Sequence, residues 1–319
     1  MTGTSLNDSA RTAWLEERRS GIGGSDVAAI MGLSPWSSAF TVWAEKVNLL
    51  PLDEDDREDF EFGHMAEDML AAYYEKRTGL AVTDRQRRAQ HPVNAWAQCT
   101  LDGMVRDIPA GWDAKTTSEP PWENIPIHYQ CQAQWTMYVT ETERFDFTVL
   151  HMAFGRAKVR TYTLERDEDD IAKIVDRCSA FWHDNVLGGV PPEVDGSDAT
   201  RDAIVACWLE PAAAVVPVDD ELRNLLRNLH LAESTAATFA AEADKVRNEL
   251  RLILADAEAI VDMDDVDRKG EPRRLVTFKP QTAVRLDVKR LKVEMPDVAE
   301  KYATTTTTRV LRVNTPKES

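Results

Sequence analysis

The stretch that decides the fold is TLDGMVRDIPAGWDAK, residues 100–115. It overlaps two extended segments, 97–105 and 112–116, in which apolar and β-prone residues dominate. Asp102-Gly103 and Pro109-Ala110-Gly111 are turn or bulge signals. The stretch therefore predicts two neighbouring strands of a sheet.

The triplet at the end of this stretch predicts a cluster of charged side chains. Side chains alternate across a strand, so Asp113 and Lys115 project to one side while Ala114 points into the core. Asp102, on the neighbouring strand, is placed to share a metal ion with Asp113. Glu67, on an earlier helix, would complete the oxygen shell that magnesium or manganese prefers.

This group suits phosphodiester hydrolysis, which needs a positioned water, a cation that withdraws charge, and stabilisation of the leaving oxygen. Under this hypothesis Asp102 and Asp113 hold one or two metal ions, and Lys115 orients or deprotonates the attacking water. Gln132, on the following helix, holds water or phosphate. Taken alone, a carboxylate beside a lysine on a strand is more often a solvated ion pair.

Working outward, the text from about residue 25 to 189 alternates helical and extended segments, which predicts a central mixed sheet with helices packed on it. Ser25 is the predicted N-cap of the first helix, and Gly79 ends the third. The other predicted elements are helices over 37–47, 128–139 and 167–187, and strands over 80–88, 145–152 and 157–164.

A domain boundary is predicted where Gly188-Gly189 and Pro191-Pro192 precede Asp195-Gly196-Ser197-Asp198. We place one domain at 1–195 and a mainly helical C-terminal region at 196–319. Its first part predicts one long helix or a helical hairpin, and the tail predicts a strand over 275–278, a helix over 287–293 and a β-prone threonine run. The broken apolar stripe of the first part comprises Leu222, Leu225, Leu226, Leu229, Val246, Leu250 and Ile253.

The charge of the chain bears on its partner. The formal net charge is −17, whereas most nucleic-acid-binding proteins have a basic face. Much of the excess lies in two acidic runs, 53–61 and 262–267, of the kind that usually forms solvated loops. Divalent cations would offset clustered carboxylates where a phosphate binds. The charge therefore weakens the case for a nucleic-acid partner without excluding one.

The four cysteines, Cys99, Cys131, Cys178 and Cys207, include no CxxC pair, so we expect free and mostly buried thiols rather than a zinc or iron–sulfur site. No apolar run approaches the roughly 20 residues of a membrane span, and the first residues lack the apolar core of a signal peptide. These features predict a cytoplasmic protein.

Five motifs in a fixed order resemble the YqaJ and lambda-exonuclease families of PD-(D/E)xK nucleases. The resemblance covers roughly residues 11–190. The motifs are RRSGIGGSD at 18–26, GHMAE at 63–67, TLDG at 100–103, DAK at 113–115 and YQCQAQWTMYVT at 129–140.

The resemblance implies a restriction-endonuclease-like α/β core, metal ligands and a binding site for the 5′-terminal phosphate. Many relatives have glutamate where this chain has Asp113. Arg19 is an alternative to Arg18, because the register between adjacent arginines is open. The implied residues are the ligands Glu67, Asp102, Asp113 and the Ala114 backbone carbonyl, the catalytic Lys115, the assisting Gln132, and the phosphate-binding Arg18 and Ser25.

The family's activity implies a magnesium- or manganese-dependent exonuclease. It would digest linear double-stranded DNA from the 5′ end and leave a 3′ overhang for a single-strand annealing protein. The resemblance also implies a homotrimer, and a phage or prophage protein in a bacterial host. An endonuclease with the same site and a non-catalytic adaptor remain alternatives. Trp36, after Ser34-Pro35, is the tryptophan we consider best placed to touch DNA.

Overall fold

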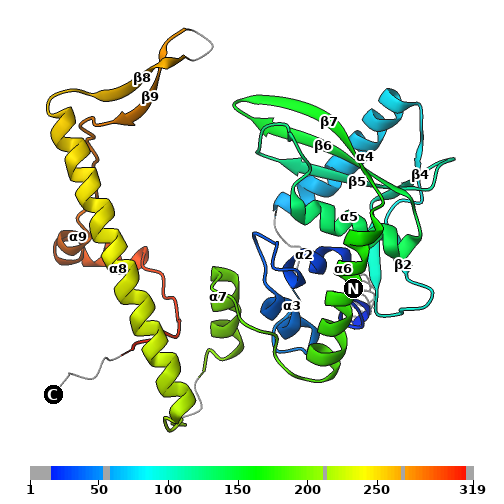
Figure 1. Ribbon diagram of the computed structural model, residues 1–319, viewed down its shortest axis with the longest axis horizontal. Coiled ribbons are helices and arrows are strands. Elements are labelled where there is room, and N and C mark those ends of the chain that lie inside the picture. Colours follow the sequence, from blue (N-terminus) through cyan, green and yellow to red (C-terminus); the bar gives the residue numbers. More distant parts are fainter. Residues whose placement is uncertain (1–15, 53–57, 211–213, 267–269, 314–319) are drawn as a thin grey trace. The chain divides into compact units, whose positions relative to one another are not determined.

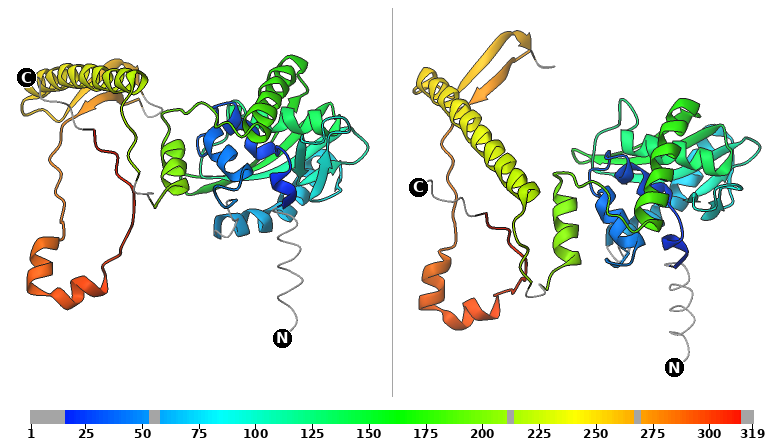
Figure 2. Two further views of the ribbon diagram at one scale, coloured as in Figure 1. Left: turned by 90° about the horizontal axis from the view of Figure 1, so that it is seen from below. Right: turned by 60° about the horizontal axis from the view of Figure 1, so that its bottom comes forward.

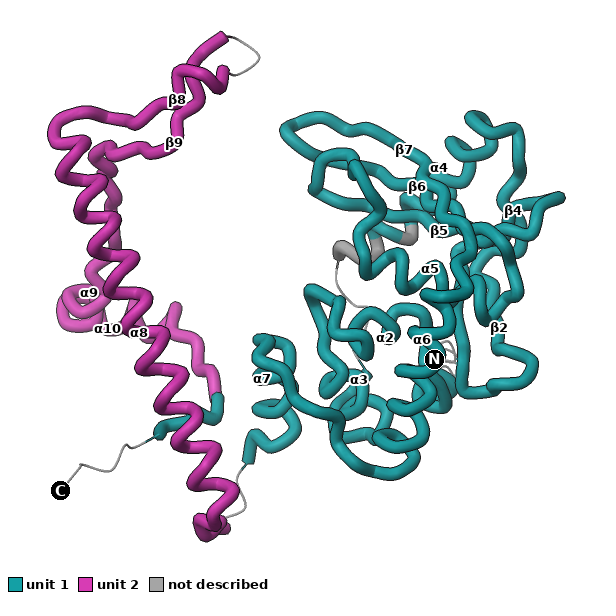
Figure 3. The backbone as a smooth tube through the Cα atoms, viewed as in Figure 1, with its two compact units in different colours: residues 1–210, 308–319 teal, residues 211–307 magenta. Residues whose placement is uncertain are grey.

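The computed structural model (Figure 1) describes residues 16–52, 58–210, 214–266 and 270–313. The side chains of 58–61 and of His64 also lie outside the description. The chain divides into two compact units (Figure 3). Unit 1 comprises residues 1–210 with 308–319, and unit 2 comprises residues 211–307.

The centre of unit 1 is a five-stranded mixed sheet with the order β1-β4-β5-β6-β7 (Figure 1). Strands β5 and β6 run parallel, and the other neighbours pair antiparallel. The parallel pair places Asp113 opposite Phe147 and Lys115 opposite Val149. The strands are β1 (Val82–Thr83), β4 (Gly103–Val105), β5 (Ala110–Thr117), β6 (Arg144–Ala153) and β7 (Arg156–Glu165).

Helices cover both faces of this sheet. Helix α5 (Ile127–Thr140) is the crossover between the parallel strands β5 and β6, and its buried Trp135 shares a core cluster with Phe147. Helix α4 (Glu58–Thr78) contributes Leu70 and Tyr74 to a second cluster with Trp112 of β5. The predicted α/β fold, a central mixed sheet flanked by helices, is confirmed.

A buried carboxylate joins α4 to the sheet. Asp146 on β6 is fully buried and accepts a hydrogen bond from the Tyr74 hydroxyl at 2.6 Å. It also accepts two from the Arg144 guanidinium at 2.9 Å and one from the Thr163 hydroxyl at 2.7 Å. Because buried charge is costly unless paired and hydrogen-bonded, this set of partners explains how Asp146 is accommodated.

The predicted strand over 80–88 is wrong in extent, because the backbone turns within it. Asp84 and Gln86 adopt left-handed conformations, with φ of 47° and 53°, which an extended strand does not contain. The chain therefore leaves β1 and re-enters extended structure as β2 (Arg87–Gln90). Strand β2 pairs with β3 (Gln98–Leu101) in a separate two-stranded sheet.

The predicted strand over 97–105 is likewise interrupted at Asp102, between β3 and β4. Position 103 is occupied by glycine because the space there is too small for a side chain. A Cβ atom on Gly103 would lie 2.4 Å from Val82 Cγ1 and 3.1 Å from the Thr83 carbonyl oxygen. The glycine therefore permits the close pairing of β4 with β1 directly after the break.

A further group of helices in unit 1 agrees with the sequence analysis except at one cap. Ser25 is not the N-cap of α2 but lies inside its first turn. The cap is Gly23, whose N–H donates to Asp26 Oδ2 at 2.9 Å, and Ser38 caps α3 by accepting from the Thr41 N–H. These helices are α2 (Gly24–Ile30), α3 (Ala39–Lys46), α6 (Glu168–Ala180) and the π-helix η1 (Phe181–Leu187) that continues α6.

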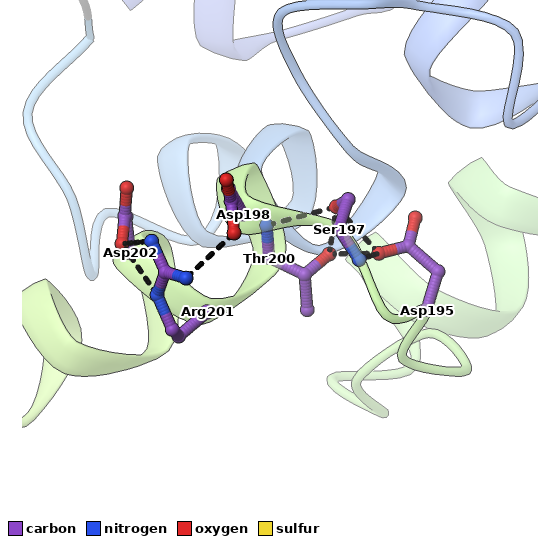
Figure 4. Close-up of polar contacts among 6 residues, drawn as sticks. All are labelled: Asp195, Ser197, Asp198, Thr200, Arg201 and Asp202. Carbon is purple, nitrogen blue, oxygen red and sulfur yellow. Dashed lines mark hydrogen bonds and ion pairs between the residues drawn. The ribbon is translucent and has the colours of Figure 1, made fainter. Parts of the chain in front are cut away.

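An unpredicted helix, α7 (Asp198–Cys207), carries unit 1 past residue 195, where we predicted the domain division. Figure 4 shows its capping network. Ser197 Oγ accepts from the Thr200 N–H at 3.1 Å, and Asp195 Oδ1 accepts from the hydroxyls of both residues. The hydrogen bonds that Asp195 accepts from Ser197 and Thr200 lower its pKa. Helix α7 packs on α3, and the unit extends to Glu210.

Unit 2 is mainly helical, as predicted. A single continuous helix, α8 (Asp220–Leu254), resolves the choice between one helix and a hairpin (Figure 2). The other elements are the hairpin strands β8 (Ala259–Val266) and β9 (Pro272–Thr277), and the helices α9 (Val288–Glu294) and α10 (Pro296–Lys301). The predicted strand and helix of the tail thus correspond to β9 and α9.

Two details of this region differ from the sequence analysis. The threonine-rich stretch at 304–313 forms no strand, since no described strand pairs with it. Its β propensity is therefore not realised, because propensity depends on a pairing partner. The second acidic run was expected in a loop, but Asp262, Asp264 and Asp265 lie in β8, where Asp262 is half-buried and the other two are exposed. The first acidic run falls on residues and side chains outside the description.

The cysteine prediction is confirmed for all four residues. Cys99, Cys131 and Cys178 are buried, Cys207 is partly exposed, and all are free thiols. Among the described helices, none is both long and apolar enough to span a bilayer.

Candidate active site

Strand β5 presents its charged residues as predicted. Ala114 packs against the α4 cluster, so Asp113 and Lys115 face the opposite side of the sheet. The Lys115 ammonium forms an ion pair with Asp113 Oδ2 and lies 5.4 Å from the centre of the Tyr129 ring on α5. The backbone alternation therefore places one carboxylate and one ammonium at a common site.

Asp102 reaches this site from the break between β3 and β4. Its Oδ2 atom accepts a hydrogen bond from the Ala114 N–H at 2.9 Å. Burial raises the pKa of Asp113 well above its usual range, and the negative charge of Asp102 adds to the increase against the opposing effect of Lys115. Burial acts to lower the pKa of Lys115, but Asp113 and Asp102 outweigh it and raise that pKa.

These residues fit a hard divalent cation. Asp113 is 3% exposed, and its buried Oδ2 accepts no hydrogen bond from the described residues, although the Lys115 ammonium lies beside it. Two adjacent carboxylates, one of them with a buried oxygen beside an ammonium, are a donor set that magnesium or manganese prefers. In the part of the chain that the structure describes, however, no three His, Cys, Asp or Glu side chains lie close enough to form a metal site.

Glu67, the third predicted ligand, has other partners in this structure. Its Oε2 atom accepts from Gln86 Nε2 at 2.8 Å and lies 3.4 Å from Arg85 Nη2. Arg85 Nε in turn donates to the Asp102 carbonyl oxygen at 2.8 Å. Glu67 is thus linked through Arg85 to the backbone of Asp102, and its predicted ligand role stays a prediction.

Sequence reasoning missed Arg85 and Gln86. Both lie in the segment predicted as a straight strand, in which alternate side chains would point away from each other. The left-handed conformation of Gln86 changes the direction of the backbone there, and both side chains reach Glu67. The sequence did contain one signal for this turn. Asp84 belongs to a residue type that is common in turns, and two polar side chains follow it.

Gln132 lies on α5, where it meets the start of α2. Its Cγ atom would lie 3.4 Å from a Cβ atom added to Gly24, an ordinary van der Waals separation, so the two helices are close together at this point. The Gln132 amide makes no hydrogen bond to the described residues. It is therefore available for a bound water or phosphate, as the sequence analysis expects.

The predicted phosphate-binding residues precede and begin α2. Ser25 is exposed, and Arg18 is half-buried at the end of the preceding chain segment. Lys46 Nζ lies 2.7 Å from Asp26 Oδ2 and donates to the Arg18 carbonyl oxygen at 2.7 Å. The Lys46 side chain is 0% exposed and that of Asp26 is 6% exposed. Burial acts to raise the pKa of Asp26, but the Lys46 and Arg18 charges outweigh it and lower the pKa.

The loop between Arg18 and Ser25 is joined to the strand that leads to Asp102. The Ile22 N–H donates to the Trp96 carbonyl at 2.7 Å, and the Ile22 carbonyl accepts from the Gln98 N–H at 2.9 Å. A Cβ atom on Gly21 would lie 2.5 Å from the Trp96 carbonyl oxygen. This close approach requires glycine, and it fixes the loop against β3.

Trp36 is an exposed aromatic side chain connected to the lysine through ring contacts. It is 69% exposed, and its ring meets the edge of His128 with 4.8 Å between centroids. His128 contacts Tyr129 at 4.2 Å, and Tyr129 is the ring beneath the Lys115 ammonium. The Trp36 N–H donates to Ser34 Oγ, which orders the loop.

Comparison with known proteins identifies the family. A model of the YqaJ-like viral recombinase domain matches residues 13–143. The uncharacterised protein YqaJ of Bacillus subtilis (strain 168) is 30% identical over 303 residues, which are 92% of this chain and 91% of that protein. The chain belongs to the YqaJ family. This confirms the resemblance, and the YqaJ assignment together with the Asp102, Asp113 and Lys115 cluster supports a nuclease.

Solved structures resemble this YqaJ-family chain over about half its length. An alkaline exonuclease from Laribacter hongkongensis is 22% identical with a TM-score of 0.47, covering 56% of this chain and 94% of that one. A phage-related exonuclease from Haemophilus somnus is 15% identical with a TM-score of 0.41, covering 53% and 96% respectively.

The raised pKa of Asp113 predicts how the metal-free protein responds to pH. A carboxyl whose native pKa exceeds its ordinary value of 3.8 binds its proton more tightly in the folded state. The stability of the metal-free protein should therefore fall as pH rises from about 4 through the raised native pKa. In chelator, we expect the melting temperature of wild type to drop more between pH 5 and pH 8 than that of Asp113→Asn.

Magnesium provides the matched test of the same carboxylate. At pH 8 it should raise the melting temperature of wild type, because a ligand that binds only the folded state stabilises it. Asp113→Asn should respond much less. Equal pH profiles for the two proteins in chelator would contradict the assignment of the pH effect to Asp113.

Proposed function

We propose that this protein is a metal-dependent exonuclease that digests linear double-stranded DNA from the 5′ end. The observation that carries the proposal is the Asp102, Asp113 and Lys115 cluster, in which the buried Asp113 carboxylate pairs with the lysine ammonium. The YqaJ-family membership supports it, since the family is described as viral recombinase-like.

Each residue of the site would have a separate role in hydrolysis. Asp102 and Asp113 would hold magnesium or manganese, with the Ala114 backbone carbonyl and Glu67 as further ligands. Such a cation withdraws charge from the phosphate oxygens and activates a bound water. Lys115 orients or deprotonates the attacking water from its position between Asp113 and Tyr129. Gln132 holds water or phosphate with its unbonded amide.

Selection of the DNA end is proposed for Arg18 and Ser25. Arginine is suited to phosphate because its planar guanidinium offers several donors. The backbone contacts of Ile22 with Trp96 and Gln98 fix this loop beside the strand leading to Asp102. Digestion from the 5′ end would leave a 3′ overhang for a single-strand annealing protein. We also propose a homotrimer, as the family resemblance implies.

The decisive experiment compares three DNA substrates of one sequence in magnesium. Two are linear duplexes with 5′-phosphate ends, one labelled at the 5′-terminal nucleotide and one at the 3′-terminal nucleotide, and the third is a closed circle. We expect early release of the 5′ label, late release of the 3′ label and no cleavage of the circle. Chelator should abolish all release.

The alternatives give different products in the same assay. Cleavage of the closed circle would replace the exonuclease with an endonuclease of the same fold. Inertness toward all three substrates in magnesium and in manganese, with retained binding of DNA ends, would favour the adaptor. Early release of the 3′ label would reverse the proposed direction.

Trp36 is expected to contribute to DNA binding near this site. Base–aromatic stacking is worth about 1–3 kcal/mol, so Trp36→Ala should raise the KM for DNA roughly ten-fold with little change in kcat. Trp36→Phe keeps an aromatic face and should lie close to wild type. Steady-state kinetics on linear duplex DNA measure both. An unchanged KM in Trp36→Ala would remove this residue from the DNA-binding surface.

A further inference from the structure

Helix α8 has a heptad pattern along its length when alanines are counted among its apolar residues. Apolar residues recur at alternating intervals of three and four from Leu222 to Ile253, without a polar interruption. The first set of positions, called a, comprises Leu222, Leu229, Ala236, Ala243 and Leu250. The second set, called d, comprises Leu225, Ala232, Phe239, Val246 and Ile253. Together these ten residues form the α8 seam.

Such a seam indicates a coiled coil rather than an ordinary surface helix. A helix packed on a globular core has a wider apolar stripe with a period of 3.6 residues, whereas a 3.5-residue period keeps a narrow seam facing another helix. A helix of 35 residues is about 50 Å long, and the seam spans more than the three to four heptads that argue for a coiled coil.

Within the described part of unit 2, the seam has no partner. Leu254, outside the seam, is the single buried residue of α8, and Phe239 and Ile253 are each 72% exposed. Helices in proteins gain most of their stability from packing an apolar face. This seam would therefore be covered by another helix of matching pattern.

A second copy of the same helix fits this requirement. In a parallel, in-register pair each seam residue meets its own counterpart, so Phe239 packs beside Phe239 and the small alanines occupy shared layers. Position g of one helix then lies near position e of the other, which brings Glu242 close to Arg247 of the second copy. In this structure Arg247 pairs with Asp244 of its own helix at 2.8 Å.

The charge of α8 is compatible with self-association. The whole chain has a net charge of −17, but α8 carries six acidic and five basic side chains. Two copies of α8 therefore repel each other little. In an antiparallel pair Glu242 would face Thr235, with no opposite charge at that position. Charge complementarity thus favours the parallel arrangement.

We propose that the α8 seam forms a parallel coiled coil with α8 of a second copy of this chain. A trimeric assembly would add a third copy on the same seam. The proposal concerns assembly and does not depend on the nuclease activity, so each can fail without the other.

The first test measures the mass of the full-length protein by light scattering. The seam variant Phe239→Glu with Ala243→Glu puts charge into the interface and should lower the mass of the assembly relative to wild type. The matched control Thr238→Glu with Ala241→Glu adds the same charge to the opposite face of the same turns and should keep the wild-type mass. A monomeric wild type, or an assembly that the seam variant leaves unchanged, would overturn the proposal.

The second test checks orientation by disulfide formation. Val246→Cys places a thiol at a d position, where it meets its counterpart in a parallel, in-register pair. Under oxidising conditions we expect a covalent dimer on a non-reducing gel. Ala241→Cys, on the outer face, controls for random collisions and for the partly exposed native Cys207. No more dimer from Val246→Cys than from the control would overturn the parallel arrangement.

Discussion

Lys115→Ala is expected to lower kcat for the hydrolysis of linear DNA by on the order of 10³-fold, the central value for loss of a positioned acid–base group. The Lys115 ammonium lies between Asp113 and the Tyr129 ring, a position that it alone occupies among the described side chains. The KM should change far less, because the residues proposed to bind the 5′-phosphate, Arg18 and Ser25, lie elsewhere in the chain. Steady-state kinetics in magnesium, with circular dichroism to verify folding, measure the effect.

Two further variants sharpen this prediction. Lys173→Ala removes an exposed lysine that pairs with Asp170 on α6, and it should keep wild-type kcat. Lys115→Arg retains the positive charge but changes its geometry, so a low kcat in this variant shows that position and proton chemistry are required as well as charge. A folded Lys115→Ala protein within a few-fold of wild type would exclude Lys115 from the chemistry.

Among the variants proposed for unit 1, Lys46→Met is expected to lower the free energy of unfolding most. Asp26 is 6% exposed, and removing Lys46 would leave its carboxylate buried without its ion-pair partner. Removal of one partner of a buried pair typically costs roughly 3–5 kcal/mol. For a unit of this size that corresponds to a fall of on the order of 10 °C in melting temperature.

The double variant Lys46→Met with Asp26→Asn is the control for this mechanism. It removes the buried charge, while the amide oxygen of the introduced side chain can still accept the Gly23 N–H, so it should recover most of the stability lost in the single variant. Denaturant unfolding of the three proteins measures the difference. If the double variant is as unstable as the single one, the loss comes from packing or from the Arg18 carbonyl contact.

The sequence predicted the site best where a local rule governs the geometry. Alternation along β5 places Asp113 and Lys115 together without any knowledge of neighbouring strands. The order of a strand, a helix and a further strand was likewise predicted, and the structure shows that α5 joins the parallel pair β5 and β6. These features depend on period and order, which a single sequence contains.

The position of Glu67 could not be predicted in the same way. It depends on the direction of the backbone at Asp84 and Gln86, where two left-handed residues interrupt a β-prone segment. Neither residue is a glycine, so the segment carries no strong signal for that conformation. The partners of Glu67 follow from tertiary geometry rather than from spacing.

The extent of unit 1 and the conformation of the threonine-rich stretch at 304–313 were also beyond sequence reasoning. Helix α7 follows two glycines and two prolines, which are typical of a linker, yet its contact with α3 includes it in the unit. The threonines of 304–313 favour extended structure but lack a described neighbour to pair with. In both cases a contact distant in sequence, or its absence among the described elements, decides the outcome.

The Asp146 network has a consequence for metal affinity. Because the Tyr74 hydroxyl of α4 donates to Asp146 of β6, helix α4 is anchored to the sheet at this point. If Glu67 ligates a cation as proposed, its side chain must leave Gln86 and Arg85, so these two residues would compete with the metal. Substitutions that weaken the Arg85 and Gln86 contacts should tighten the binding of the cation. The residues that hold Glu67 in the metal-free protein would thus set the metal concentration needed for activity.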